Sequence, residues 1–153
     1  FTFGTGDFTI ECFVYFNNTS GTQYICGQSH SDFASGTAFQ IYLYLNTIYG
    51  WVGSGGNEVS ASVFSATTWV HLAFVRQGEN IRLYYDGVQQ NSTNIGASYS
   101  PTVSTGPFSL GTVGNYSSGN LNAFLDEFRV TKGLCRYPDG TSFTAPTKSF
   151  ANR

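Results

Sequence analysis

Apolar and polar residues alternate with a period of two along most of this chain. In the stretch 7–16, the even positions from Phe8 to Phe16 are apolar, whereas Thr9 and Glu11 between them are polar. Because successive side chains of a strand point to opposite faces, this pattern predicts a strand with one buried face. The same reasoning predicts strands at residues 7–16, 23–28, 39–45, 48–53, 59–64, 69–76, 80–87, 107–113 and 122–131.

The segments between these strands are rich in Gly, Asn, Ser and Thr, as turns are. Residues 77–79 close the clearest hairpin, and Asn46-Thr47 is predicted to be a two-residue turn. One edge strand is expected within the polar stretch 89–106. The tail, residues 133–150, is expected to pack across the rim of the fold.

Short strands that recur at intervals of about 8–12 residues, with turns between them, are typical of an antiparallel sandwich or barrel. Neither a linker nor an internal repeat divides the sequence. We therefore expect one all-β domain over residues 1–153, which we interpret as a fragment of a longer polypeptide.

Composition excludes two classes of partner. The net charge is −2, and the seven basic residues are scattered, so we expect no nucleic-acid groove. No apolar run approaches the length of a membrane span, so no membrane insertion is expected. The three cysteines are odd in number and irregularly spaced, which favours free thiols over disulfides.

Three stretches resemble a known family. They read GDFTIECFVYF (6–16), TTWVHLAFVRQGENIRLYYDGVQ (67–89) and LDEFRVTKGLCRYPDG (125–140), the last followed by SFTAPTKSF. In this order they resemble the opening strand, central hairpin and closing strand of laminin-G-like, concanavalin A-like jelly-roll domains. The form DEFRVTKG-x-x-RY with a following F-T-x-P is most similar to versions found in bacteriophage virion proteins.

The resemblance implies a fold and two roles. The fold would be a jelly-roll β-sandwich of two antiparallel sheets. The role would be that of a non-enzymatic module on a virion surface, as a tail fibre, adhesin or capsid decoration that binds host glycans. The alternative is a purely architectural domain that packs against other virion proteins, and a homo-oligomer is compatible with either. The location would be the virion surface, outside the cell.

Asp126 and Glu127 are adjacent within the closing strand and invite a comparison with glycosidases. Regular alternation would place them on opposite faces of the sheet, where they could not flank one glycosidic bond. The superfamily's glucanases carry an E-x-D-x-x-E strand, and this sequence has none. We therefore predict that the protein is not an enzyme and has no catalytic residues.

Alternation also predicts that Asp126 lies on the more apolar face of its strand, where a carboxylate needs donors or a cation. The simpler interpretation is a hydrogen-bonded anchor for the loop 114–120. The other is a calcium ligand completed by loop carbonyl groups, since calcium prefers about 6–8 oxygen ligands. The remaining acidic residues are scattered. We therefore assign no metal ligand and expect no required cofactor.

For two residues of the central hairpin, Trp69 and His71, the sequence predicts a structural role. Trp69 is expected to be largely buried. His71 alternates with apolar neighbours and occupies the position of the family's own His, so it is expected to pack and form hydrogen bonds rather than act as a base.

The candidate binding site is aromatic. Folding 39–45 onto 48–53 through the predicted turn gathers polar-tipped rings on one face, opposite an aliphatic face that suits the core. Such rings can stack on sugars while an amide bonds the hydroxyl groups. The other interpretation is that this face is a second buried side or a subunit contact. The predicted ligand-binding residues are Gln40, Tyr42, Tyr44, Tyr49 and Trp51.

Overall fold

The computed structural model describes residues 2–29, 37–53, 57–62, 66–101, 104–114 and 118–151. Within them the secondary structure is entirely β, and no helix is long and apolar enough to cross a membrane. The strands are β1 (Phe8–Phe16), β2 (Thr22–Ser29), β3 (Thr37–Tyr44), β4 (Thr47–Val52), β5 (Glu58–Ser62), β6 (Trp69–Gln77), β7 (Asn80–Tyr85), β8 (Val88–Asn94), β9 (Phe108–Leu110) and β10 (Ala123–Lys132). The predicted all-β sandwich is confirmed.

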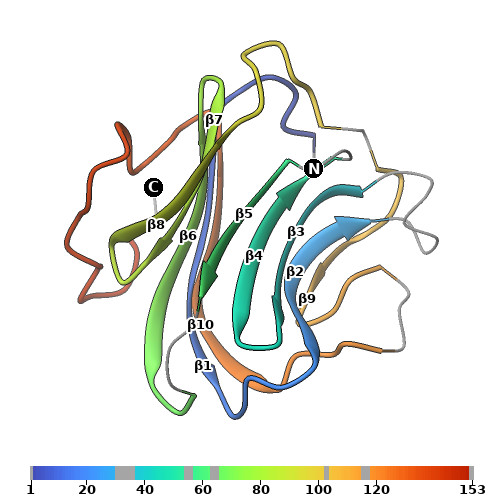
Figure 1. Cartoon of the computed structure of the whole chain (residues 1–153), viewed down its shortest axis with the longest axis vertical. Helices are drawn as coiled ribbons and strands as arrows, with labels where there is room; N and C mark the ends of the chain where they lie inside the picture. The colour runs from blue at the N-terminus through green and yellow to red at the C-terminus, as the bar shows by residue number, and fades with distance from the viewer. Residues whose placement is uncertain are drawn as a thin grey trace.

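Two five-stranded antiparallel sheets face one another (Figure 1). Sheet A has the order β10-β1-β6-β7-β8, and sheet B has the order β5-β4-β3-β2-β9. The predicted hairpin of β6 and β7 closes through Gly78 and Glu79, because Gln77 pairs with Asn80. The edge strand expected in the polar stretch is β8, which pairs only with β7 among the described strands.

The core fills the space between the sheets, and the alternation along the chain decides which residues enter it. The even-numbered residues of β1 are all buried, as predicted. Phe74 of β6 packs edge-on against Phe8, with ring centroids 5.4 Å apart. On the opposite sheet, a Cβ added at Gly50 would come within 2.6 Å of the Phe74 ring. Gly50 therefore lets the two sheets approach at this point.

The tail covers the outer face of sheet A rather than the rim of the sandwich (Figure 1, red). Tyr137 and Phe143 stack on each other, with ring centroids 3.7 Å apart. Both rings form T-shaped contacts with the His71 ring, at 6.0 and 5.9 Å. The expectation that the tail packs across the rim is therefore wrong. Cys12, Cys26 and Cys135 are free, as predicted, and all three are buried.

Beneath the tail lies a buried carboxylate, that of Glu11. Its Oε1 accepts hydrogen bonds from Nε and Nη2 of Arg129 at 2.9 and 2.7 Å. Its Oε2 accepts one from the Tyr137 hydroxyl at 2.6 Å and lies 3.1 Å from Nε2 of His71. His71 is thus a packed, hydrogen-bonded residue, as expected from the sequence.

These contacts change the acidity of Glu11. Burial alone would raise the pKa of its carboxyl group, because burial disfavours the charged form. The hydrogen bonds from the three neighbouring side chains outweigh that effect and hold the pKa below its ordinary value of 4.5. Glu11 is therefore an ionised anchor between sheet A and the tail.

Candidate functional site

The β3–β4 hairpin turns one residue earlier than predicted. Tyr44 pairs with Thr47, so the two-residue turn is Leu45-Asn46 and not Asn46-Thr47. Leu45 and Asn46 have φ angles of 43° and 64°, as a type I′ turn requires. Tyr42 consequently pairs with Tyr49, whereas the predicted turn would have placed it opposite Trp51. The predicted register is wrong, but it is wrong by two positions, which leaves each side chain on its predicted face.

An aromatic row crosses three adjacent strands on the outer face of sheet B. Tyr42 of β3 stacks on Tyr49 of β4, with ring centroids 5.0 Å apart and planes inclined by 15°. On its other side, Tyr42 packs against Tyr24 of β2 at 5.7 Å. All three rings are half-buried, so each keeps a surface open to solvent. The row is a continuous line of three half-exposed tyrosine rings, in which Tyr24 is tilted by 46° to Tyr42.

A second row on this face carries polar groups. Trp51 is half-buried and lies between Gln40 of β3 and Glu58 of β5. Glu58 accepts a long hydrogen bond, 3.4 Å, from the Tyr42 hydroxyl. Burial, and secondly the negative charge of Glu58, raise the pKa of Tyr42, so its hydroxyl keeps its proton at neutral pH.

Gln40 differs from its aromatic neighbours because it is only 3% exposed. Its Nε2 forms no hydrogen bond, although the large majority of buried polar atoms find a partner. Gln40 is therefore a buried amide beside Trp51 whose donor lacks an acceptor within the protein.

The structure therefore brings together the five residues predicted from the sequence, on one outer face. Tyr44 is the most open of them, 47% exposed at the end of its strand. Sequence reasoning missed Tyr24 and Glu58, which belong to the same face through strands β2 and β5. The alternation within 23–28 could have indicated Tyr24, but only the strand order β5-β4-β3-β2 shows that it lies beside Tyr42. We call Tyr24, Tyr42, Tyr44, Tyr49 and Trp51 the aromatic face.

The expectation for Asp126 and Glu127 is wrong because β10 contains a β-bulge. One residue separates Glu11 from Phe13 in β1, whereas two separate their partners Arg129 and Asp126 in β10. Glu127 occupies the extra position, with a φ of 50°. The alternation therefore shifts by one residue, and Asp126 points outward, opposite Phe13.

Asp126 is consequently exposed and not buried. Its Oδ1 accepts a hydrogen bond from the Glu127 backbone N–H at 2.8 Å, so within the described residues it anchors the bulge. Residues 115–117 of the loop that it was expected to anchor lie outside the described residues. Across the described part of the chain, no group of three or more His, Cys, Asp or Glu side chains could hold a metal ion.

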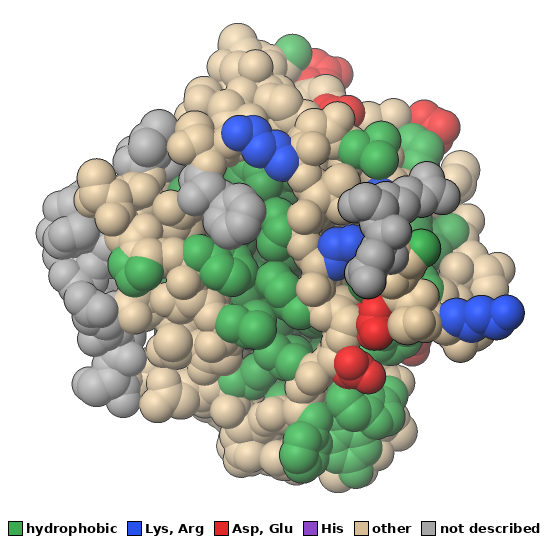
Figure 2. All heavy atoms as spheres, turned by 180° about the vertical axis from the view of Figure 1, so that it is seen from behind, with side chains coloured by type: hydrophobic (Ala, Val, Ile, Leu, Met, Phe, Trp, Pro, Cys, Tyr) green, Lys and Arg blue, Asp and Glu red, His purple; other side chains and the backbone are tan. Residues whose placement is uncertain are grey.

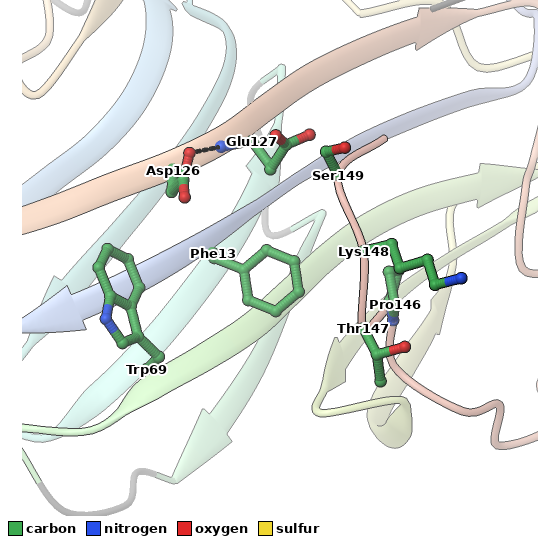
Figure 3. A pocket seen from close by; sticks show the side chains of 8 residues that line it. All are labelled: Phe13, Trp69, Asp126, Glu127, Pro146, Thr147, Lys148 and Ser149. Carbon is green, nitrogen blue, oxygen red and sulfur yellow. Dashed lines mark hydrogen bonds between the residues drawn. The ribbon is translucent and has the colours of Figure 1, made fainter. Parts of the chain in front are cut away.

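Both carboxylates line a depression of about 410 Å³ between sheet A and the tail (Figure 3). Phe13 and Trp69 lie across from the two carboxylates, and residues of the tail bound the depression beside them. Seen from behind, acidic side chains border a hydrophobic patch at the lower end of the molecule (Figure 2). The lining residues are Phe13, Trp69, Asp126, Glu127, Pro146, Thr147, Lys148 and Ser149.

Trp69 is 50% exposed, so the expectation that it is buried is wrong. It begins β6 on the outer face of sheet A, where it pairs with Tyr15 and packs against that ring at 5.7 Å. Phe124 packs on the other side of Tyr15 at 6.0 Å and is also exposed. These three rings form an aromatic ladder beside the depression, in which the half-buried Tyr15 lies between the exposed Trp69 and Phe124.

Because half of its surface remains in water, Trp69→Ala should lower the free energy of unfolding by about 1 kcal/mol or less, far below the roughly 3–5 kcal/mol of a buried Trp. Urea unfolding followed by tyrosine fluorescence and far-UV circular dichroism measures the difference. A loss above 3 kcal/mol would show that the ladder supports the fold.

The two facing antiparallel sheets define a β-sandwich of the concanavalin A-like type. The chain belongs to the concanavalin A-like lectin/glucanases superfamily, whose Laminin_G_3 family profile matches residues 1–134. No curated protein sequence matches the chain significantly.

Solved structures show the same fold at low sequence identity. A candidate carbohydrate-binding protein from Bacteroides ovatus superposes with a TM-score of 0.68 and 13% identity, over 94% of this chain and 39% of that one. The ligand-binding domain of botulinum neurotoxin serotype D in complex with N-acetylneuraminic acid superposes with a TM-score of 0.65 and 9% sequence identity, over 88% of this chain and 35% of that one. The binding domain of botulinum neurotoxin DC in complex with rat synaptotagmin II has a TM-score of 0.62 and 12% sequence identity, over 86% of this chain and 34% of that one. This chain spans less than half the length of each of the three.

Proposed function

We propose that this domain is a non-enzymatic module of a virion surface, as in a tail fibre, adhesin or capsid decoration, and that it binds host-surface glycans. The observation that carries the glycan-binding role is the aromatic face, where half-exposed rings lie beside the unpartnered amide of Gln40. Flat rings match the apolar C–H faces of a pyranose, and Gln40, Glu58 and the tyrosine hydroxyls supply donors and acceptors for its hydroxyl groups.

The virion location rests on the resemblance of 125–140 and 142–150 to phage virion proteins. The glycan-binding role is further supported by the solved structures of the same fold, one of which holds N-acetylneuraminic acid. Ligand sites of this kind combine apolar rings with a few polar groups that fix orientation, as this face does.

Trp51→Ala and Tyr42→Ala should each weaken glycan binding about five- to a hundred-fold, because stacking on one ring is worth about 1–3 kcal/mol in other aromatic platforms. The melting temperature should change little, since both rings are half-exposed. A glycan array identifies a ligand for the wild-type domain, and calorimetric titration then measures the dissociation constants of the variants.

Trp69→Ala is the matched control, because Trp69 lies half-exposed on the outer face of the other sheet. It should bind the glycan as the wild type does. If Trp51→Ala and Tyr42→Ala instead unfold the domain, the aromatic face is structural and the glycan site is not there.

The second candidate function is architectural, and the aromatic ladder of Trp69, Tyr15 and Phe124, two of whose rings are exposed, favours it. Exposed aromatic side chains that cluster on a surface are common in protein–protein contacts. A domain that binds no glycan on the array, but associates with itself or with other virion proteins through this ladder, would be an architectural module.

A further inference from the structure

The depression between β10 and the tail offers a second site of different chemistry from the aromatic face. Asp126 and Glu127 lie along one side of it, and Trp69 and Phe13 lie across from them (Figure 3). The four side chains come from β10, β6 and β1, which are adjacent strands of sheet A. The site is thus built on paired strands and bounded by the tail.

Each carboxylate has one oxygen that accepts a hydrogen bond from a backbone N–H group. Asp126 Oδ1 accepts from the Glu127 N–H at 2.8 Å, and Glu127 Oε2 accepts from the Phe150 N–H at 2.6 Å. Among the described residues, neither carboxylate has an ion-pair partner or a hydrogen bond to its second oxygen.

Neither of the two described basic residues nearby forms an ion pair with these carboxylates. The guanidinium group of Arg129 pairs with Glu11 at 2.7 Å and lies over the Phe150 ring at 3.9 Å. Lys148 lines the depression, but its ammonium group is directed away from Trp69 and Phe13 (Figure 3). Two formal negative charges therefore face two aromatic rings.

We propose that this depression binds an organic cation, that is, an alkylammonium or guanidinium group. Carboxylates form charge-assisted hydrogen bonds with such a group, and the face of an indole ring attracts its positive charge. A metal ion would find only two protein carboxylates and an apolar floor, whereas an uncharged sugar would leave the two negative charges unneutralised. The cation belongs either to a small amine or to a Lys or Arg side chain of a partner protein.

Nuclear magnetic resonance of the ¹⁵N-labelled chain tests this assignment. The chain has two tryptophans, so the Trp69 indole reports on the depression and the Trp51 indole, on the other sheet, is an internal control. The probes are n-butylammonium, N-acetyl-lysine methylamide, N-acetyl-arginine methylamide and the uncharged N-acetyl-norleucine methylamide. The cationic probes should shift the Trp69 indole and the Phe150 amide with dissociation constants of about 1–10 mM, as expected for one small group.

Asp126→Asn is the informative variant, because it removes one charge and keeps an oxygen for the Glu127 N–H. It should weaken binding of the cationic probes about five-fold or more, and 0.5 M salt should weaken it similarly. Glu79→Gln removes an equal charge from the exposed β6–β7 turn and should leave binding unchanged.

The probes also separate the sources of the cation. Equal binding of n-butylammonium and the two charged amides would support a small amine, whereas binding of the charged amides alone would support a side chain of a partner protein. The proposal is overturned if the norleucine amide binds as tightly as the lysine amide, or if Asp126→Asn leaves the dissociation constants of the cationic probes unchanged. It is also overturned if no probe shifts the resonance of the Trp69 indole at a probe concentration of about 50 mM.

Discussion

Glu11→Ala should lower the free energy of unfolding by about 3–5 kcal/mol, the cost of removing one partner from a buried ion pair. The change leaves the Arg129 guanidinium, the Tyr137 hydroxyl and the fully buried His71 without their common acceptor. The docking of the tail should loosen together with the fold, because Tyr137 belongs to it. Urea unfolding gives the free energy, and hydrogen exchange of the amides of residues 133–150 reports on the docking of the tail.

Protonation of Glu11 at acidic pH should also destabilise the fold, without a mutation. Because the pKa of Glu11 is lower in the folded protein than its ordinary value of 4.5, its stabilisation is complete above that value and is lost as the pH falls through the folded-state pKa. The wild type should therefore lose more stability than Glu11→Gln between pH 5 and about pH 2. Glu79→Gln, an exposed control, should change stability by about 0.5 kcal/mol or less. Parallel pH profiles for wild type and Glu11→Gln would contradict this role.

Phe74→Ala should cost about 3–5 kcal/mol, since Phe74 is fully buried between the two sheets. Its ring lies over Gly50 of sheet B and against Phe8 of its own sheet. A cavity at this position removes contacts on both sides of the core, and the close approach of the sheets prevents it from collapsing completely. Thermal and urea unfolding both measure the loss.

Phe124→Ala is the control for this prediction. Phe124 is also a phenylalanine of sheet A, but it is 59% exposed on the outer face. It should lose about 1 kcal/mol or less, since most of its ring is already in water. Equal losses for the two variants would mean that the core does not centre on Phe74.

Much of the fold could be predicted from local alternation. The even-numbered residues of β1 and the aliphatic residues Ile41, Leu43, Ile48 and Val52 all entered the core as predicted. Tyr42, Tyr44, Tyr49 and Trp51 also share a face as predicted, although the turn was misplaced. A register error of two positions preserves the side of the sheet, because side chains alternate with a period of two.

The errors lie where alternation stops being local. The bulge at Glu127 inserts one residue into β10 against β1, which moves Asp126 from the expected inner face to the outer one. Nothing in the sequence around Glu127 marks it, since an αL position at a bulge usually carries Gly. Trp69 is a related case: alternation gives its face, but not whether another segment covers that face.

The sequence by itself determined the strands, the hairpin of β6 and β7, the two-sided pattern of each sheet and the family, because all of these follow from local periodicity and short motifs. Only the tertiary structure decided which outer face stays open. The tail covers Glu11 from 126 positions away and leaves Trp69 half in water, whereas the aromatic face of sheet B remains half-exposed. Covering an outer face depends on contacts between distant segments, and a period of two within one strand carries no information about them.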